Sequence, residues 1–262
     1  MKTMFTLLLA LVFTYTNAQN LPEVFSAINI NLKEDHSSTE FANFMGQLNE
    51  GMQHFGKGIG MWASYGDRGD RKGKFAYGFA FELKENRDYY FPTADAQGEN
   101  AYPQITALIA EMNQAGYSTN SELFEEDGGY TDYVCVGYDA LINPKIGGLV
   151  GVRPFPVKKG SEEAFEKFVA SELYPAYDKN IDGVHLFVYK GDRGQGKDSY
   201  IVLMSFKSVE LRNSFFPSEG SNGTDAFSTE FSKVQAVMEK FNGFGEKTYV
   251  ENPYTDYVGI KL

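Results

Sequence analysis

The three histidines are the residues that acid–base chemistry would use first. His36, His54 and His185 lie far apart in the sequence. None has a second His, a Cys or a carboxylate at the spacing of a zinc site, so we expect no metal. Spacing supports no Ser-His-Asp order, nucleotide fingerprint or paired-carboxylate motif. The sequence therefore names no reaction.

His185 has the most informative setting of the three. It falls on the same face of a predicted strand as Phe187 and Tyr189. Comparing the chain with itself places Gly60 at the position of His185, and Trp62 faces the same way in that segment. One half would thus hold a polar group in an aromatic cavity, with His185 as acid, base or ligand anchor. Alternatively, a neighbour satisfies His185 and the aromatic residues are core.

The tetrapeptide Gly-Asp-Arg-Gly occurs twice, at residues 66–69 and 191–194. Glycines beside an aspartate suit a hairpin that needs positive φ, which predicts a turn at each site. A functional interpretation has Arg68 and Arg193 reaching out to hold an anionic ligand with their planar guanidinium groups. A phosphate loop is not indicated, because neither segment leads from a strand into a helix.

Two further arginines are each repeated together with an aspartate. Arg87 and Arg212 precede segments that end in Phe-Pro, and Asp132 and Asp256 occupy the middle of a repeated Thr-Asp-Tyr. Their presence in both copies favours an Arg–Asp tie that closes the end of each sheet over a catalytic role, since such ion pairs are commonly structural.

These pairs belong to an internal repeat. Sliding the sequence by 125 residues lays residues 58–92 over 183–217 with 11 of 35 positions identical, where unrelated segments would share about two. At a shift of 124, Thr-Asp-Tyr-Val at 131–134 matches 255–258. A unit of about 120 residues is a domain rather than a solenoid repeat. We therefore expect repeats at 21–142 and 146–262.

Both copies predict the same order of elements. Helices are expected from the capping box at Ser37–Glu40, from Ser161, and around Leu108 and Val234. Pro175 should kink or end the helix from Ser161. The order β-α-β-β-α-β is the split βαβ, or ferredoxin-like, plan and places the chain in the α+β class. Strands are expected at 24–31, 59–65, 75–83, 131–138, 149–155, 184–190, 200–207 and 255–262.

Apolar side chains lie on both faces of the predicted central strands. Met61 and Trp62 point to opposite sides of one strand, and Leu186 and Phe187 do so in its counterpart. Helices cover only one face of a ferredoxin-like sheet, so the second apolar face needs another cover, which the other copy supplies. Two such sheets packed face to face make a barrel with helices outside.

In element order and face polarity, most of residues 21–262 resembles the dimeric α+β barrel superfamily, which contains the antibiotic-biosynthesis monooxygenase-like and stress-responsive barrel domains. In that superfamily two chains usually form the barrel. The resemblance implies a fused pseudo-dimer here, and it carries no catalytic motif that would assign a functional residue.

Composition and the N-terminus indicate where the protein acts. Of 262 residues, 42% are hydrophobic and 15% aromatic, which excludes a disordered chain. A net charge of −11 speaks against nucleic acid and anionic lipid as partners. Lys2, an apolar run from Met4 to Phe13 and the small residues before Gln19 are typical of a secretory signal over 1–18. We expect a periplasmic or secreted protein.

Two further features bound the possibilities. The N-terminal apolar run is too short to cross a bilayer and no later stretch approaches that length, so no membrane insertion is expected. Cys135 is the only cysteine, lies in an apolar run and should be a small buried hydrophobe.

Three functions follow from these features. We expect first an exported, cofactor-independent protein that holds a small, partly apolar ligand in a cleft between each sheet and its helices, as a monomeric pseudo-dimer or a homodimer. Trp62, His185 and Tyr189 would line the cleft, with Arg68 and Arg193 at its rim. The alternatives are a monooxygenase-like enzyme acting on an aromatic or polyketide-like substrate, by fold analogy, and a structural or interaction protein. An enclosed pocket that touches His185 would favour the first two.

Overall fold

The computed structural model describes residues 21–94, 101–120, 122–140 and 147–262. The predicted secretory signal and the boundary between the predicted repeats lie outside these ranges. We call residues 21–140 the N-terminal half and 147–262 the C-terminal half. Within the described ranges, no helix has both the length and the apolar character that a bilayer crossing requires.

Eight of the described strands close an antiparallel barrel. The cyclic order is β1-β3-β2-β9-β6-β8-β7-β5, and β5 pairs back onto β1. A further short strand, β4, continues the β5 side of β1. The α+β class and the barrel are therefore confirmed. The strands are β1 (Val24–Leu32), β2 (Ile59–Gly69), β3 (Phe75–Phe81), β4 (Phe124–Glu126), β5 (Thr131–Cys135), β6 (Leu149–Pro154), β7 (Val184–Gly194), β8 (Tyr200–Phe206) and β9 (Thr255–Gly259).

The two halves meet along two hydrogen-bonded seams. In one, Ser64–Gly69 of β2 pairs with Thr255–Gly259 of β9. In the other, Thr131–Cys135 of β5 pairs with Tyr189–Gly194 of β7. Because both seams are strand ladders, the sheet runs without a break around the barrel, and its interior is shared by the halves.

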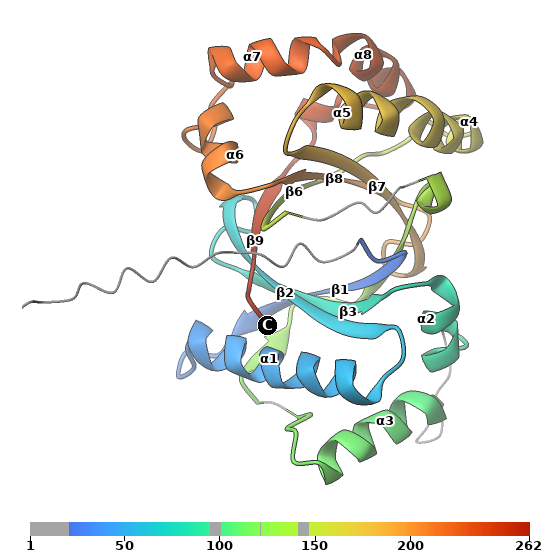
Figure 1. Ribbon diagram of the computed structural model, residues 1–262, viewed down its shortest axis with the longest axis vertical. Helices are drawn as coiled ribbons and strands as arrows, with labels where there is room; N and C mark the ends of the chain where they lie inside the picture. Colours follow the sequence, from blue (N-terminus) through green and yellow to red (C-terminus); the bar gives the residue numbers. More distant parts are fainter. Residues whose placement is uncertain (1–20, 95–100, 121, 141–146) are drawn as a thin grey trace, which may run out of the picture.

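Helices cover the barrel on two opposite sides (Figure 1). Those of the N-terminal half lie against β1–β3, and those of the C-terminal half lie against β6–β8. They are α1 (Ser38–Phe55), α2 (Lys84–Tyr90), α3 (Pro103–Gln114), α4 (Glu162–Phe168), α5 (Tyr174–Asn180), α6 (Val209–Phe215), α7 (Asp225–Ser232) and α8 (Gln235–Phe244), with 3-10 turns at Tyr138–Ala140 and Tyr249–Glu251.

Local sequence explains two of these helices. At the start of α1, the predicted capping box forms: the Glu40 amide donates to Ser37 Oγ, and the Ser37 amide donates to the Glu40 carboxylate. Pro175 does not end its helix. A π-helical turn over Val169–Leu173 joins α4 to α5, and this wider turn lets the helix pass the proline, which has no amide hydrogen.

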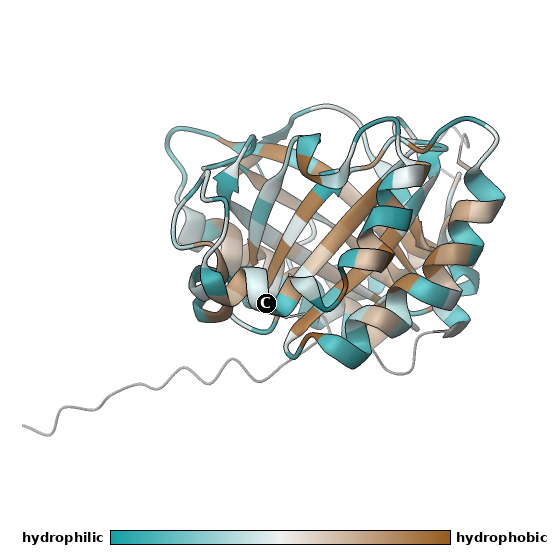
Figure 2. Cartoon of the chain, turned by 90° about the horizontal axis from the view of Figure 1, so that it is seen from above, coloured by the Kyte–Doolittle hydropathy of each residue, from teal (hydrophilic) through white to brown (hydrophobic). Residues whose placement is uncertain are grey.

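Side chains fill the space between the sheet and the helices. In the N-terminal half, Phe41 and Met45 of α1 are buried with outward-facing residues of β2 and β3. In the C-terminal half, Phe165 of α4 and Phe241 of α8 belong to an equivalent core against β7 and β8. Figure 2 shows hydrophobic residues concentrated along the strands and hydrophilic residues in the loops.

The Gly-Asp-Arg-Gly segments are not turns, which corrects the sequence-based expectation. Residues 66–69 and 191–194 end β2 and β7, where each strand shifts register against β9 or β5. The chain reverses only in the residues that follow. A Cβ on Gly66 would lie 2.0 Å from the carbonyl oxygen of Arg71, so glycine lets the next loop fold back against the strand. The predicted positive φ does occur, at Gly69 and Gly194.

Candidate ligand cavity inside the barrel

A cavity of about 2030 Å³, open to solvent, occupies the barrel interior and continues beyond it. Inward-facing residues of both halves line its inner part, and residues outside the sheet, among them Asn49 of α1, Asp178 and Glu230, line its outer part. The expected cleft between each sheet and its helices is instead filled by the two outer cores. The concave space therefore lies on the other face of the sheet from the one expected.

Trp62 forms part of the wall of this cavity and not of the sheet–helix cleft in which it was expected. Its indole Nε1 donates a hydrogen bond of 2.9 Å to the carbonyl oxygen of Ser26 on β1. Phe25 packs edge-on against it, with ring centroids 5.8 Å apart at 88°. These contacts fix the indole, so that it presents a preformed aromatic surface.

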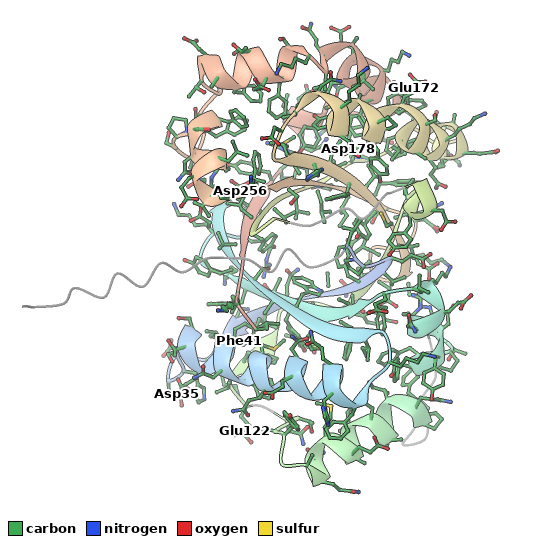
Figure 3. The ribbon with its side chains drawn as sticks, in the orientation of Figure 1. Asp35, Phe41, Glu122, Glu172, Asp178 and Asp256 are labelled. Atoms are coloured by element: carbon green, nitrogen blue, oxygen red, sulfur yellow. The ribbon has the colours of Figure 1, made fainter. Side chains whose placement is uncertain are left out.

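His185 also lines the cavity, at the start of β7. Its Nδ1 lies 3.1 Å from Oδ1 of Asp178 on α5, and its ring stacks on Phe187 with an interplanar angle of 19°. Figure 3 shows Asp178 on the side of α5 that faces β7. In the tautomer that donates Nδ1–H to Asp178, the Nε2 lone pair is left to accept a proton or bind a ligand.

Tyr189 fills the barrel rather than lining the cavity. Its ring is fully buried against Phe25 at 4.7 Å, and its hydroxyl donates to the carbonyl oxygen of Pro22 at 2.8 Å. Cys135 and Leu203 belong to the same cluster. Burial raises the pKa of the Cys135 thiol to about 12, so Cys135 is the small buried hydrophobe that the sequence predicted.

Arg68 and Arg193 each bind the opposite half of the chain. Arg68 donates to the carbonyl oxygen of Phe216 at 2.7 Å and to Asn213 at 2.8 Å. Arg193 donates to the carbonyl oxygen of Phe91 and to Asp88 at 2.8 Å. Neither is among the cavity-lining residues. Their assignment to a ligand stays a prediction, and their contacts are those of structural residues.

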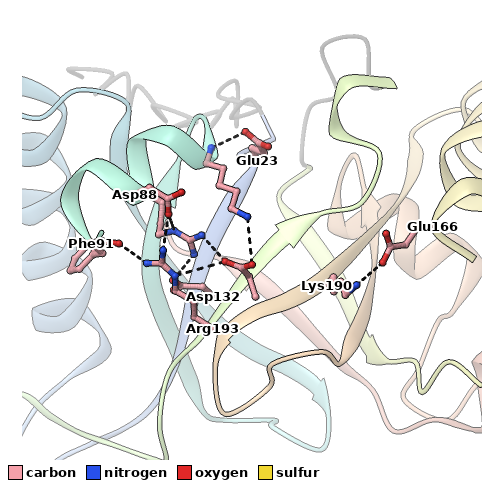
Figure 4. A network of polar contacts seen from close by, with 10 residues as sticks. Glu23, Asp88, Phe91, Asp132, Glu166, Lys190 and Arg193 are labelled. Atoms are coloured by element: carbon pink, nitrogen blue, oxygen red, sulfur yellow. Dashed lines mark hydrogen bonds and ion pairs between the residues drawn. The ribbon is translucent and has the colours of Figure 1, made fainter. Parts of the chain in front are cut away.

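The predicted Arg–Asp ties are confirmed, and each also joins the two halves. Arg87 has no exposed surface and donates to Asp132 at 2.9 Å and to Asp192 of the other half at 2.6 Å. Figure 4 shows Asp132 of this network beside Asp88 and Arg193. Arg212 of α6 donates to Asp256 of β9, which is labelled in Figure 3, and to Asp67 of the other half.

The Arg87 tie is balanced in charge. Its three cationic side chains, Arg87, Arg193 and Lys84, pair with three carboxylates, those of Asp88, Asp132 and Asp192. Burial raises the pKa of Asp192, but the hydrogen bond from Arg87 and the nearby positive charges outweigh it and hold the pKa below its usual value. The folded state thus favours the deprotonated form of Asp192.

Two polar groups of the cavity wall were not found from the sequence. Ser64 Oγ and two guanidinium nitrogens of Arg71, Nε and Nη2, are buried with no hydrogen-bond partner in the described part of the chain. One feature of the sequence could have drawn attention to Arg71. At the 125-residue shift it aligns with Gly196, so the C-terminal half has no charge at the equivalent position. Among the described residues, no three His, Cys, Asp or Glu side chains gather as a metal site would require.

No protein-family model and no curated protein matches the chain. Solved structures do match. The "putative monooxygenase" of Lactobacillus acidophilus NCFM superposes with a TM-score of 0.52 at 14% identity, over 91% of this chain and 94% of that one. A protein of the same description from Fusobacterium nucleatum gives a TM-score of 0.49 at 9% identity, over 92% and 94%. The first likeness shows a shared fold, that of the α+β barrels.

Proposed function

We propose that this is an exported protein of two fused ferredoxin-like repeats that binds a small, partly apolar ligand inside the barrel. The observation that carries the proposal is the cavity of about 2030 Å³. Protein interiors are normally packed with few voids larger than a water molecule. A concave space lined in part by the inner faces of otherwise regular strands is a candidate binding site.

The wall indicates the chemistry of the ligand. Phe25, Trp62 and Tyr133 supply ring surfaces from β1, β2 and β5, and Phe25 contacts both of the others. Aromatic rings pack favourably against other rings and against flat apolar groups. We therefore infer a ligand with an aromatic or similarly flat apolar body.

The His185–Asp178 pair favours a second candidate function, an enzyme of the monooxygenase-like kind. An imidazole that a carboxylate orients is a suitable proton acceptor for an acidic C–H or O–H group of a bound substrate. Because His185 lines the cavity, a substrate bound there could place such a proton next to the imidazole. In this proposal Asp178 is a positioning residue, and the oxidant would be dioxygen.

Binding can be tested with the neutral fluorescent probe N-phenyl-1-naphthylamine. Trp62 is the only tryptophan of the chain and lines the cavity, so its fluorescence should be quenched as the probe binds. Ala76→Ile places a larger side chain in the wall, and we expect it to weaken binding about tenfold. Ala107→Ile makes the same change at an exposed position of α3 and should leave binding unchanged.

Two results would count against the proposal. One is a wild-type protein in which the probe neither gains fluorescence nor quenches Trp62. The other is probe binding that Ala76→Ile leaves as it was, which would place the probe outside the barrel. For the enzyme alternative, oxygen consumption with a panel of phenolic substrates should depend on His185, and a catalytically silent wild type would reject it.

A further inference from the structure

We infer that the ligand of the barrel cavity carries a carboxylate, and that Arg71 binds it. This inference rests on the proposed function and specifies its ligand as an apolar, ring-containing carboxylic acid. Three observations lead to it: the way the loop that follows β2 is held, the unsatisfied edge of the Arg71 guanidinium, and the difference between the two halves at this position.

The loop that carries Arg71 is fixed at both its backbone and its side chain. The carbonyl of Arg71 lies over Gly66, in space that any Cβ would occupy. The Arg71 amide donates to Thr255 Oγ1 of β9 at 3.2 Å, so the loop is also tied across the seam. The guanidinium Nη1 donates to Asp127 at 3.1 Å. Arg71 is thus held in place before any ligand binds.

The remaining edge of the guanidinium makes no well-aligned hydrogen bond. Its Nε and Nη2 are buried without a geometrically satisfied partner within the described residues, and Arg71 is a cavity-lining residue. These two nitrogens lie on one edge of the planar group, where their hydrogens match the two oxygens of a carboxylate. Buried donors without acceptors are costly, so the edge favours a ligand that supplies two acceptors.

The arginines of the two Arg–Asp ties can be compared with Arg71 in how far their guanidinium nitrogens are hydrogen-bonded. Arg87 donates through Nε, Nη1 and Nη2, each to a carboxylate. Arg212 likewise donates through all three nitrogens. This chain therefore satisfies its buried guanidinium groups fully where their role is structural, and Arg71 departs from that pattern at the cavity.

The surroundings of Arg71 fit an acid with an apolar body. Burial raises the pKa of Tyr257, which also lines the cavity, and outweighs the opposing effects of the Arg71 charge and of a side-chain hydrogen bond between Arg71 and Tyr257. Ser64 Oγ adds a second unpartnered group to the same wall. The 125-residue shift places Gly196 at the position of Arg71, so Arg71 has no counterpart at the equivalent place in the other half.

The test compares 2-naphthoate with 2-naphthamide, two probes of nearly equal shape that differ in charge. Each is titrated against bound N-phenyl-1-naphthylamine. We expect the wild type to bind 2-naphthoate at least tenfold more tightly than 2-naphthamide, because only the carboxylate accepts two charge-assisted hydrogen bonds. Arg71→Gln should abolish this preference while leaving the affinity for 2-naphthamide within about twofold.

Lys72→Gln is the matched control. It removes one positive charge from the neighbouring position, where the side chain is 61% exposed and pairs with Glu219. The preference for 2-naphthoate should survive this change, and circular dichroism should show that both variants are folded.

The outcomes separate this inference from the proposed function. If both naphthalene probes displace N-phenyl-1-naphthylamine equally well from the wild type, the cavity binds ligands but the carboxylate is wrong. The same conclusion holds if the preference persists in Arg71→Gln or is lost in Lys72→Gln. If none of the probes binds, the proposed function itself fails.

Discussion

The two halves of the barrel differ most on the surface they share. On β7 and β8, the inner face carries Phe187, Tyr189, Ile201 and Leu203, which fill their side of the interior. At the equivalent positions of β2 and β3, the 125-residue shift places Trp62, Ser64, Ala76 and Gly78. The cavity exists because three of these four replacements remove most of a large side chain.

The outer faces of the two halves, in contrast, are alike. Each half keeps its buried arginine, its Thr-Asp-Tyr strand and its Gly-Asp-Arg-Gly segment, and each set makes the same contacts with the other half. Contacts that hold the halves together thus occur in both halves, whereas the inner faces differ. This contrast indicates that stability depends on the symmetric part of the molecule, and ligand binding on the asymmetric part.

The largest effect should come from breaking a symmetric tie. Arg87→Met would leave Asp132, whose side chain is only 7% exposed, as a buried carboxylate without its partner. Removing one member of a buried ion pair costs about 3–5 kcal/mol. Urea denaturation should therefore show a much lower midpoint. Lys72→Met breaks an exposed ion pair and should change the midpoint little. Equal midpoints for both variants would mean that the ties do not stabilise the barrel.

A reciprocal exchange of the inner faces should give a smaller and unequal effect. Tyr189→Ser introduces the N-terminal residue into the filled side and removes a fully buried ring, at about 3 kcal/mol. Ser64→Tyr makes the opposite change in the wall of the cavity, where space is available. We expect it to cost less than about 1 kcal/mol and to weaken N-phenyl-1-naphthylamine binding at least tenfold. Similar stability losses for both variants would contradict the asymmetry.

The smallest effect should appear on acidification. The pKa of Asp192 is held below its usual value, so its contribution to stability is complete above the unfolded pKa of about 3.9 and is lost as the pH falls through the folded pKa. Asp192→Asn should therefore be less stable than the wild type by about 1–2 kcal/mol at pH 7, and the gap should narrow below about pH 4.

Asp35→Asn is the control for this measurement, since the Asp35 side chain is 82% exposed. Its unfolding free energy should follow that of the wild type across the pH range. A gap between wild type and Asp192→Asn that stays constant down to pH 2 would show that the Asp192 carboxylate is not stabilised by its neighbours.

Strand and long-helix order could be predicted from the sequence because periodicity and the repeat reinforce each other. The Arg–Asp ties were predictable because each pair occurs in both halves, and the capping box at Ser37 was predictable from its local spacing. Helices α2 and α6 were not predicted, since seven residues are too few to show a helical period. The reversal after Gly69 was placed too early, because the pairing of β2 with β9 is a long-range contact.

The position of the cavity could not be predicted from the pattern of apolar residues alone. Alternation shows that both faces of a strand are apolar, but the distance between facing sheets depends on how the barrel closes. Trp62 and His185 were expected to line a cleft between the sheet and its helices, whereas both line the cavity on the inner face. Tyr189 lies on that face too, yet its ring is packed away beside Pro22. Asp178 was missed because α5 brings it to His185 through the fold.

The two seams also determine when the barrel can close during synthesis of the chain. The N-terminal half leaves the ribosome with β2 and β5 exposed along one edge each, and their partners are β9 and β7. Since β9 (Thr255–Gly259) follows all the other strands in the chain, the circle can be completed only after the C-terminal half has been synthesised. Until then the nascent protein exposes unpaired strand edges and the apolar inner face of its sheet, which are sites for aggregation and for chaperone binding.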